Sequence, residues 1–145
     1  MVQVADDALA LADALRPVLL RLARHLRTVT QRSGVTSAQV SLLIALEFHP
    51  GMTTQELAER EGLSTPAISG HLARLEGLKL IRRERTADGR QIGIFLTNAG
   101  RGRLASVREQ RNSWLASRLD ELTPHERESI RASLAALKRI STGER

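Results

Sequence analysis

Apolar residues three and four positions apart predict helices along most of this chain. From about residue 5 to residue 30, leucine, alanine and valine recur at that spacing, which indicates one long amphipathic helix. Pro17 interrupts the segment, and it either kinks this helix or lies in the first turn of a helix that starts near Asp13. The opposite face carries mainly arginine, and it is either solvated or a surface for phosphate or ligand contacts.

Two capping boxes predict the next two helices. Thr36 and Gln39 have the spacing at which a cap and the third helical residue exchange hydrogen bonds, and an apolar stretch follows them. This helix should end at residues 49–51, where histidine, proline and glycine succeed one another. Thr53 and Glu56 repeat the capping-box spacing, so another helix should begin there.

A tight turn and a further helix follow. Gly62 permits the turn, Ser64 or Thr65 can cap the new helix, and the helix should run to about Leu78. Small Ala58 lets the two helices cross closely, so the pair has the spacing of a helix-turn-helix. The predicted buried stripe of the second helix consists of Ile68, Leu72 and Leu75.

The outward face of this second helix carries small or hydrogen-bonding side chains instead of carboxylates. Such a face fits the major groove of DNA, where side chains read base edges. The alternative interpretation is an ordinary amphipathic hairpin with a solvated face. The candidate DNA-binding residues on this helix are Ser64, Thr65, Pro66, Ser69, Gly70, His71 and Arg74.

Residues 80–85 and 92–96 change to a strand-like pattern rich in β-branched and aromatic residues. Ala87-Asp88-Gly89 supplies a turn between them, so a β-hairpin is predicted. A helix-turn-helix followed by such a hairpin is a winged helix-turn-helix, and its basic wing makes double-stranded DNA the expected partner. The candidate wing residues are Arg82, Arg83, Arg85, Asp88 and Arg90.

Two further helices are predicted after Thr97 and after Thr123-Pro124. Together with the first helix, they present more apolar surface than a compact domain of this size can cover alone. We therefore expect them to pair with a second copy of the chain, although Trp114 could equally belong to a plain core. The candidate dimerisation residues are Leu15, Trp114, Leu119, Leu122, Ile130, Leu134, Leu137 and Ile140.

Charge and composition narrow the possible functions. The net charge is +6, and Lys79 and Lys138 are the only lysines among 22 basic residues, so the surface is rich in the guanidinium groups that suit phosphate. The absence of cysteine excludes disulfides, thiolate metal ligands and cysteine nucleophiles. The four histidines are too scattered to suggest a metal site. We therefore expect no enzymatic activity and no cofactor.

The start of the chain has neither the basic nor the apolar segment of a signal peptide. No apolar run approaches the length needed to span a membrane. We expect a cytoplasmic protein without a membrane partner.

Over nearly its full length the chain resembles the MarR family of bacterial transcriptional regulators. The resemblance lies in short motifs of the winged region and the segment after it: Leu57-Ala58-Glu59, Gly62-Leu63-Ser64, Leu75-Glu76 with Leu80-Ile81, Asp88 with Arg90, and Leu96-Thr97 followed by Gly100. Two positions depart from the family pattern. Glu61 lies where many members have an apolar residue, and Gly70 lies where a larger polar side chain is common.

The resemblance implies a mainly helical fold with a β-hairpin wing, arranged as one domain over residues 1–145. Residues 36–97 would form the DNA-binding region, and residues 1–35 and 98–145 would supply the dimerisation helices. Recognition helices would enter two major grooves, and wing arginines, steadied by an Asp-Arg pair such as Asp88 and Arg90, would enter minor grooves. The expected function is a homodimeric repressor of an inverted-repeat operator, released in many members by a small aromatic or phenolic effector.

A second hypothesis remains open. A winged helix can also serve protein association or nonspecific coating of nucleic acid, with its basic wing solvated. Only the sequence-specific regulator predicts one preferred inverted repeat among random duplexes.

Overall fold

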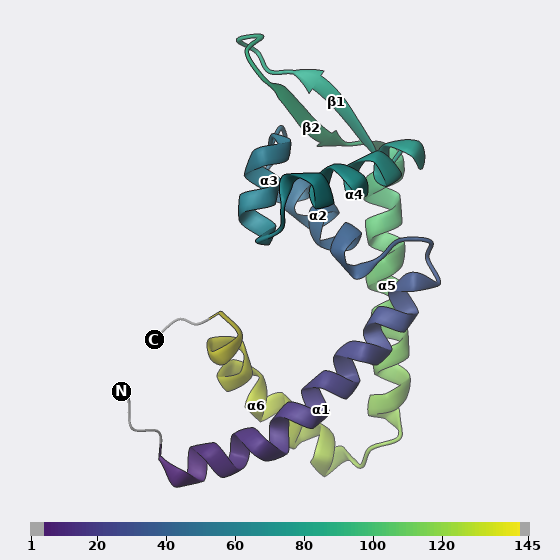
Figure 1. Cartoon of the computed structure of the whole chain (residues 1–145). Coiled ribbons are helices and arrows are strands. Elements are labelled where there is room, and N and C mark those ends of the chain that lie inside the picture. Colours follow the sequence, from purple (N-terminus) through teal and green to yellow (C-terminus); the bar gives the residue numbers. More distant parts are fainter. Residues whose placement is uncertain (1–4, 143–145) are drawn as a thin grey trace. The chain divides into compact units, whose positions relative to one another are not determined.

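The computed structural model describes residues 5–142 and confirms a mainly helical chain with one β-hairpin. Figure 1 shows this hairpin projecting from the helices that precede it. In chain order, the described elements are α1 (Asp6–Gln31), α2 (Ser37–Phe48), α3 (Thr54–Glu61), α4 (Thr65–Gly77), β1 (Ile81–Arg85), β2 (Ile92–Leu96), α5 (Asn98–Asp120) and α6 (Pro124–Thr142).

The chain divides into two compact units, one up to Arg111 and one from Asn112 onward. The first unit contains the helix-turn-helix and the hairpin, and the second contains the end of α5 and all of α6. The single domain expected over residues 1–145 stays a prediction.

The α1 helix continues through Pro17 without a break and changes direction along its length. Proline has no amide hydrogen to donate and its ring crowds the preceding turn, so an interior proline bends a helix. Pro17 therefore lies inside one long helix that begins at Asp6, and the alternative of a helix starting near Asp13 is wrong.

Polar caps start the helices of the winged region, as the sequence predicts. The Thr36 hydroxyl accepts the Gln39 amide hydrogen at 3.2 Å, and the Gln39 side chain accepts the Thr36 amide hydrogen at 3.0 Å. Thr53 and Glu56 form the same reciprocal pair, at 3.2 and 2.8 Å. Both capping boxes are confirmed.

The turn of the helix-turn-helix depends on Gly62, which ends α3 with a backbone φ of +65°, a conformation that glycine adopts without strain. The next helix, α4, is capped by Ser64, whose hydroxyl accepts the Ala67 amide hydrogen at 3.3 Å. Of the two candidate caps, Ser64 is the one used, and Thr65 is the first helical residue.

The hydrophobic core is formed mainly by buried residues of the winged region and the start of α5. The predicted stripe of α4, Ile68, Leu72 and Leu75, is completely buried. Leu104 and Val107 of α5 belong to the same hydrophobic cluster, so the first part of α5 packs on the DNA-binding region. Burying a leucine or isoleucine side chain contributes about 1.5–3 kcal/mol, so these contacts fix the orientation of α4.

The wing is built on more than its own two strands. Strands β1 and β2 are antiparallel, with Ile81 opposite Leu96. The segment before α3 joins them, because Gly51 donates its amide hydrogen to the Ile94 carbonyl and Ile94 donates to the Met52 carbonyl, both at 2.9 Å. At Gly93 a β-carbon would lie 2.8 Å from the Gly51 carbonyl oxygen, so only glycine allows this close approach.

Polar contacts attach the end of α1 to α5 within the first unit. Arg111 donates from Nε to the Thr30 hydroxyl at 2.8 Å, and Arg103 donates to the Ser33 carbonyl at 2.8 Å. Thr30 is fully buried, and burial lowers the pKa of the Arg111 guanidinium. These contacts give the long α1 helix a fixed attachment at its C-terminal end.

In the second unit, the apolar side chains of α6 are not buried by other parts of the described chain. The α6 helix begins with a capping box, in which the Thr123 hydroxyl accepts the Glu126 amide hydrogen at 3.2 Å and Glu126 accepts the Thr123 amide hydrogen at 2.8 Å. No residue of α6 is buried in the described chain. A helix with large apolar residues and no buried position has its apolar surface facing solvent in the single chain.

Candidate nucleic-acid interface

The face of α4 opposite its buried stripe is exposed, as predicted. His71 is half-buried, and the other candidates on this helix are exposed: Ser64, Thr65, Pro66, Ser69, Gly70 and Arg74. The Ser64 hydroxyl already serves as the helix cap. Thr65, Ser69, His71 and Arg74 are the other candidates whose side chains can donate hydrogen bonds to a groove.

Gly70 is not needed by the fold of the chain itself. A β-carbon built at Gly70 would meet no atom within 4 Å, and the residue has ordinary helical geometry. Glycine inside a helix costs about 1 kcal/mol relative to alanine. Either this cost is tolerated, or the missing side chain serves contact with something outside the chain.

Two of the wing arginines are held by neighbouring side chains. The Arg82 guanidinium lies 4.9 Å from the centre of the Phe95 ring and forms an ion pair with Glu84. Arg83 donates from Nε to the Glu76 carboxylate at 3.2 Å, which connects β1 to the end of α4. These contacts place two positive charges on the flank of the hairpin.

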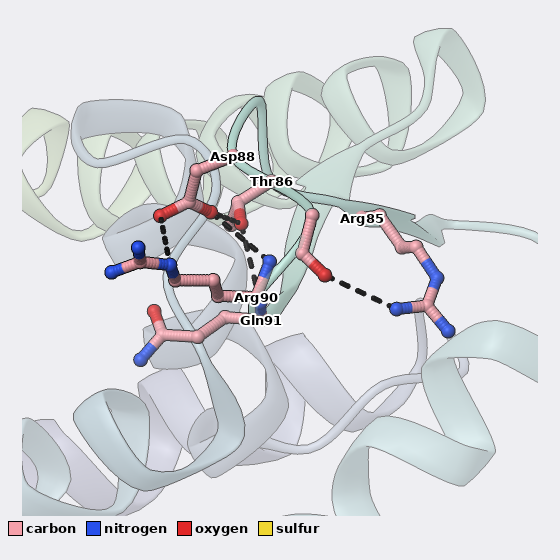
Figure 2. A network of polar contacts seen from close by, with 6 residues as sticks. Arg85, Thr86, Asp88, Arg90 and Gln91 are labelled. Atoms are coloured by element: carbon pink, nitrogen blue, oxygen red, sulfur yellow. Dashed lines mark hydrogen bonds and ion pairs between the residues drawn. The ribbon is translucent and has the colours of Figure 1, made fainter.

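The other two wing arginines lie at the turn, in the network shown in Figure 2. Arg85 donates from a terminal nitrogen to the Gly89 carbonyl at 3.2 Å. The Arg90 side chain is 85% exposed, and its Nε lies 3.9 Å from an Asp88 carboxylate oxygen. That distance allows an ion pair but is too long for a hydrogen bond.

The Asp88 carboxylate is held mainly by other groups. One of its oxygens accepts the Thr86 hydroxyl hydrogen at 2.6 Å and the Arg90 amide hydrogen at 3.1 Å. The hydrogen bond from Thr86 first, and that from the Arg90 amide second, lower the pKa of Asp88 below its ordinary value. Asp88 is therefore ionised at neutral pH and fixes the backbone of the turn.

Glu61, which differs from the apolar residue expected from the MarR resemblance, has a polar partner in the structure. The Ser41 hydroxyl donates to the Glu61 carboxylate at 2.8 Å, which links α2 to the end of α3. A polar partner thus satisfies a side chain at a position where many MarR-like proteins have an apolar residue.

An open pocket of about 360 Å³ lies beside α4, within the unit that ends at Arg111. It combines one guanidinium with side-chain amides, and its lining residues are Gln31, Gly34, Val35, Thr36, Gln39 and Arg74. Arg74 therefore belongs both to this pocket and to the exposed face of α4.

The residues that the structure describes offer no metal site and no membrane-spanning helix. Among them, no group of three or more histidine, aspartate or glutamate side chains could hold a metal ion. Within the same residues, no helix is long and apolar enough to cross a membrane.

The candidate dimerisation residues divide by exposure. Ile130, Leu134 and Ile140 are exposed by 41%, 46% and 65%. The remaining candidates are half-buried in the single chain: Leu15, Trp114, Leu119, Leu122 and Leu137. The α1 helix adds further exposed apolar side chains, namely Leu9, Leu11, Val18, Leu19, Leu20 and Leu22.

Sequence reasoning missed some residues of the candidate interface. Thr86, Glu76 and Phe95 hold wing side chains in place, but none of them was a candidate from sequence. A threonine two residues before a turn aspartate is a weak signal for Thr86, since such hydroxyls often bond within turns. Glu76 and Phe95 act through pairings across elements, for which a single sequence offers no signal.

Comparison with known proteins agrees with this architecture. The family model described as the MarR family matches residues 33–92. An HTH-type transcriptional regulator of Mycobacterium leprae is 32% identical over 127 residues, which cover 87% of this chain and 89% of that protein. The HTH-type transcriptional repressor MdtR of Bacillus subtilis is 34% identical over 97 residues, 66% of this chain and 63% of the repressor.

A solved structure shows the same fold. A variant of MepR from S. aureus, bound to an oligodeoxyribonucleotide, superimposes with a TM-score of 0.70 at 23% identity. The match covers 92% of this chain and 97% of the MepR chain.

Proposed function

Because the chain belongs to the MarR family and is a transcriptional regulator of that type, we propose that it is a homodimeric, sequence-specific repressor of an inverted-repeat operator. The observation that carries the proposal is the presence of two basic or polar surfaces on one compact unit. These surfaces are the face of α4 that carries Ser69, His71 and Arg74, and the exposed arginine at the tip of the wing. The proposed site of action is the cytoplasm, where the operator DNA lies.

The proposed division of work follows from the geometry of each surface. Ser69, His71 and Arg74 on α4 contact base edges or phosphates in the major groove, while Arg90 enters the adjacent minor groove. Phosphate contacts supply affinity, and contacts with base edges supply specificity. The similarity to a MepR variant bound to an oligodeoxyribonucleotide and to the repressor MdtR supports this assignment.

The proposed dimer rests on exposed apolar side chains of the terminal helices. In a single chain, Ile130, Leu134 and Ile140 of α6 lie in solvent, as do several leucines of α1. Covering such surface in a symmetric dimer removes it from water at about 25 cal/mol for each Å² buried. Two copies related by a two-fold axis require a two-fold symmetric operator, with half-site centres roughly 10 bp apart.

A selection from random duplexes tests this function. The full chain is incubated with random double-stranded DNA, and the bound fraction is amplified and sequenced over several rounds. One enriched inverted repeat is expected. Enrichment of direct repeats only, or of no sequence at all, contradicts the proposal and favours nonspecific coating of DNA.

Variants of α4 then test which residues read bases. Ser69→Ala and His71→Ala should change the preferred bases within each half-site, with discrimination falling by about 1–3 kcal/mol for a side chain that bonds a base edge. Arg139→Ala, which removes an exposed charge outside α4 and the wing, is the control. An equal loss on all duplexes would make the tested side chain a phosphate contact.

The pocket beside α4 supports a further part of the proposal, release by a small aromatic or phenolic effector. Arg74 and the amides of Gln31 and Gln39 suit a small planar molecule with a carboxylate or hydroxyl group. Occupation of the pocket would withdraw Arg74 from DNA. Salicylate, used as a probe, should weaken operator binding by the wild-type chain and have less effect on Arg74→Gln; no effect on either contradicts effector release through this pocket.

A further inference from the structure

Thr86 is the most connected residue of the wing turn. Its amide hydrogen bonds to the Gln91 carbonyl at 2.8 Å, and its carbonyl accepts the Gly89 amide hydrogen at 2.8 Å. Its hydroxyl donates to Asp88 at 2.6 Å and accepts the Gln91 amide hydrogen at 3.3 Å. The side chain thus connects both strands of the hairpin to the carboxylate at its tip (Figure 2).

The same carboxylate lies close to Arg90 at two points, its backbone amide and its side chain. The Asp88 oxygen that accepts the Thr86 hydroxyl also accepts the Arg90 amide hydrogen, at 3.1 Å. The other Asp88 oxygen lies 3.9 Å from Arg90 Nε. An exposed carboxylate can rotate about its side-chain bonds unless a bond holds it, and the Thr86 hydroxyl is the shortest of these contacts.

We infer that Thr86 is a positioning residue for DNA recognition by the wing: its hydroxyl fixes the Asp88 carboxylate, which in turn holds Arg90 in the orientation that enters the minor groove. This inference rests on the proposed function, since it assigns Arg90 to DNA. Thr86 itself does not contact DNA in this scheme.

Thr86→Val and Thr86→Ser are the matched variants. Valine keeps the β-branched shape that suits a strand and removes only the hydroxyl, whereas serine keeps the hydroxyl and removes a methyl group. A loss that is seen with valine and restored with serine therefore belongs to the hydroxyl and not to packing.

The first measurement is local and needs no DNA. The pKa of Asp88 is followed by carboxyl NMR of the full chain, and the amide resonance of Arg90 is followed in the same samples. In Thr86→Val the Asp88 pKa should rise toward its ordinary value, because the main hydrogen bond that lowers it is lost. In Thr86→Ser it should stay low.

The second measurement is DNA binding at several salt concentrations, on the selected duplex with A·T or G·C flanks. Thr86→Val should weaken binding by about five- to tenfold on A·T flanks, the range expected for the loss of one ordinary hydrogen bond. The preference for A·T flanks should shrink with it, and Thr86→Ser should retain both. In an Arg90→Ala background, Thr86→Val should cause no further loss.

The outcomes separate the inference from the function on which it rests. If Arg90→Ala weakens binding but Thr86→Val does not, the inference is overturned and the proposed function stands. An equal further loss from Thr86→Val in the Arg90→Ala background also overturns it, because the hydroxyl would then act without Arg90. If the wild-type chain selects no duplex, the proposed function fails, and with it the role of Thr86 in recognition.

Discussion

Arg83 and Glu76 form an ion pair between the wing and α4, with 3.2 Å between Arg83 Nε and a Glu76 carboxylate oxygen. Glu76 belongs to the last turn of α4, and Arg83 lies in the middle of β1. The pair neutralises one wing arginine before any phosphate approaches. A negative charge at this place also repels DNA.

Glu76→Gln should therefore bind DNA more tightly, by a few-fold, while losing at most about 1 kcal/mol of stability as expected for an exposed pair. The freed guanidinium should steepen the dependence of log K on log salt by up to about 0.9 per protomer. Titrations at several salt concentrations check this. Glu59→Gln is the control, because its carboxylate contacts Gln55 instead of an arginine; an equal gain in both variants would show that net charge alone is responsible.

Arg90→Ala should weaken operator binding in both half-sites and lower the salt slope by up to about 2 per dimer, at about 0.9 per phosphate contact. The effect should be larger on A·T flanks, where a narrow minor groove attracts arginine. Asp88→Ala should weaken binding less, because Arg90 keeps its positive charge even when the contacts of Asp88 with the turn are lost. Unchanged affinity and slope in Arg90→Ala would restrict Asp88 and Arg90 to closing the turn.

Leu134→Asp should put an unpaired charge into the proposed dimer contact of α6 and cost several kcal/mol of association or folding free energy. Leu137→Asp should behave alike. Ala132→Asp, about 200° around the same helix from Ile130, is the matched control and should remain a dimer. Mass measurement in solution at micromolar concentration checks this, and a wild-type monomer that bound DNA tightly would contradict the dimer.

Gly70→Ala should stabilise the folded chain by up to about 1 kcal/mol, since a β-carbon there meets nothing within 4 Å. Gly77→Ala, at the end of the same helix and also in open space, is the control. Thermal unfolding and operator titration decide between the two explanations of Gly70. Weaker binding by Gly70→Ala alone would mean that the helix backbone approaches DNA closely, whereas unchanged binding would mean that the cost of glycine is simply tolerated.

Gly100→Ala should destabilise the chain by about 1–3 kcal/mol or more, because its β-carbon would lie 2.1 Å from the Leu80 carbonyl oxygen. Gly102→Ala, two residues further along α5, has open space around it and should not destabilise. Denaturant unfolding of both variants measures the difference. Equal stabilities would show that α5 does not approach Leu80, the residue before β1, as closely as described.

The winged region was predictable because its signals are local. The caps at Thr36, Thr53 and Ser64 need only a spacing of three residues, and the stripe of α4 needs only the helical period. Sequence left the effect of Pro17 open, since a proline fits both the first turn and a bent interior. In the structure, Pro17 lies in the interior of α1.

The contacts that hold the wing and its arginines in place were not predictable from the sequence. The pairing of Met52 with Ile94 is a single bridge, too short to produce an alternating pattern. The contacts from Arg83 to Glu76 and from Arg82 to Phe95 join residues 7 and 13 positions apart on different elements. Such pairings depend on how the elements meet in space, which one sequence without its relatives does not reveal.

The bridge between Met52 and Ile94 has a mechanical consequence. It fastens the wing to the segment that starts the helix-turn-helix, and Gly93 has no side chain to hold the two apart. This bridge therefore connects the wing directly to the segment that leads into α3. In the proposed dimer, a change in the separation of the two winged regions would therefore displace the wing and α4 of each protomer as one piece, whereas an effector beside α4 would act on Arg74 within one protomer.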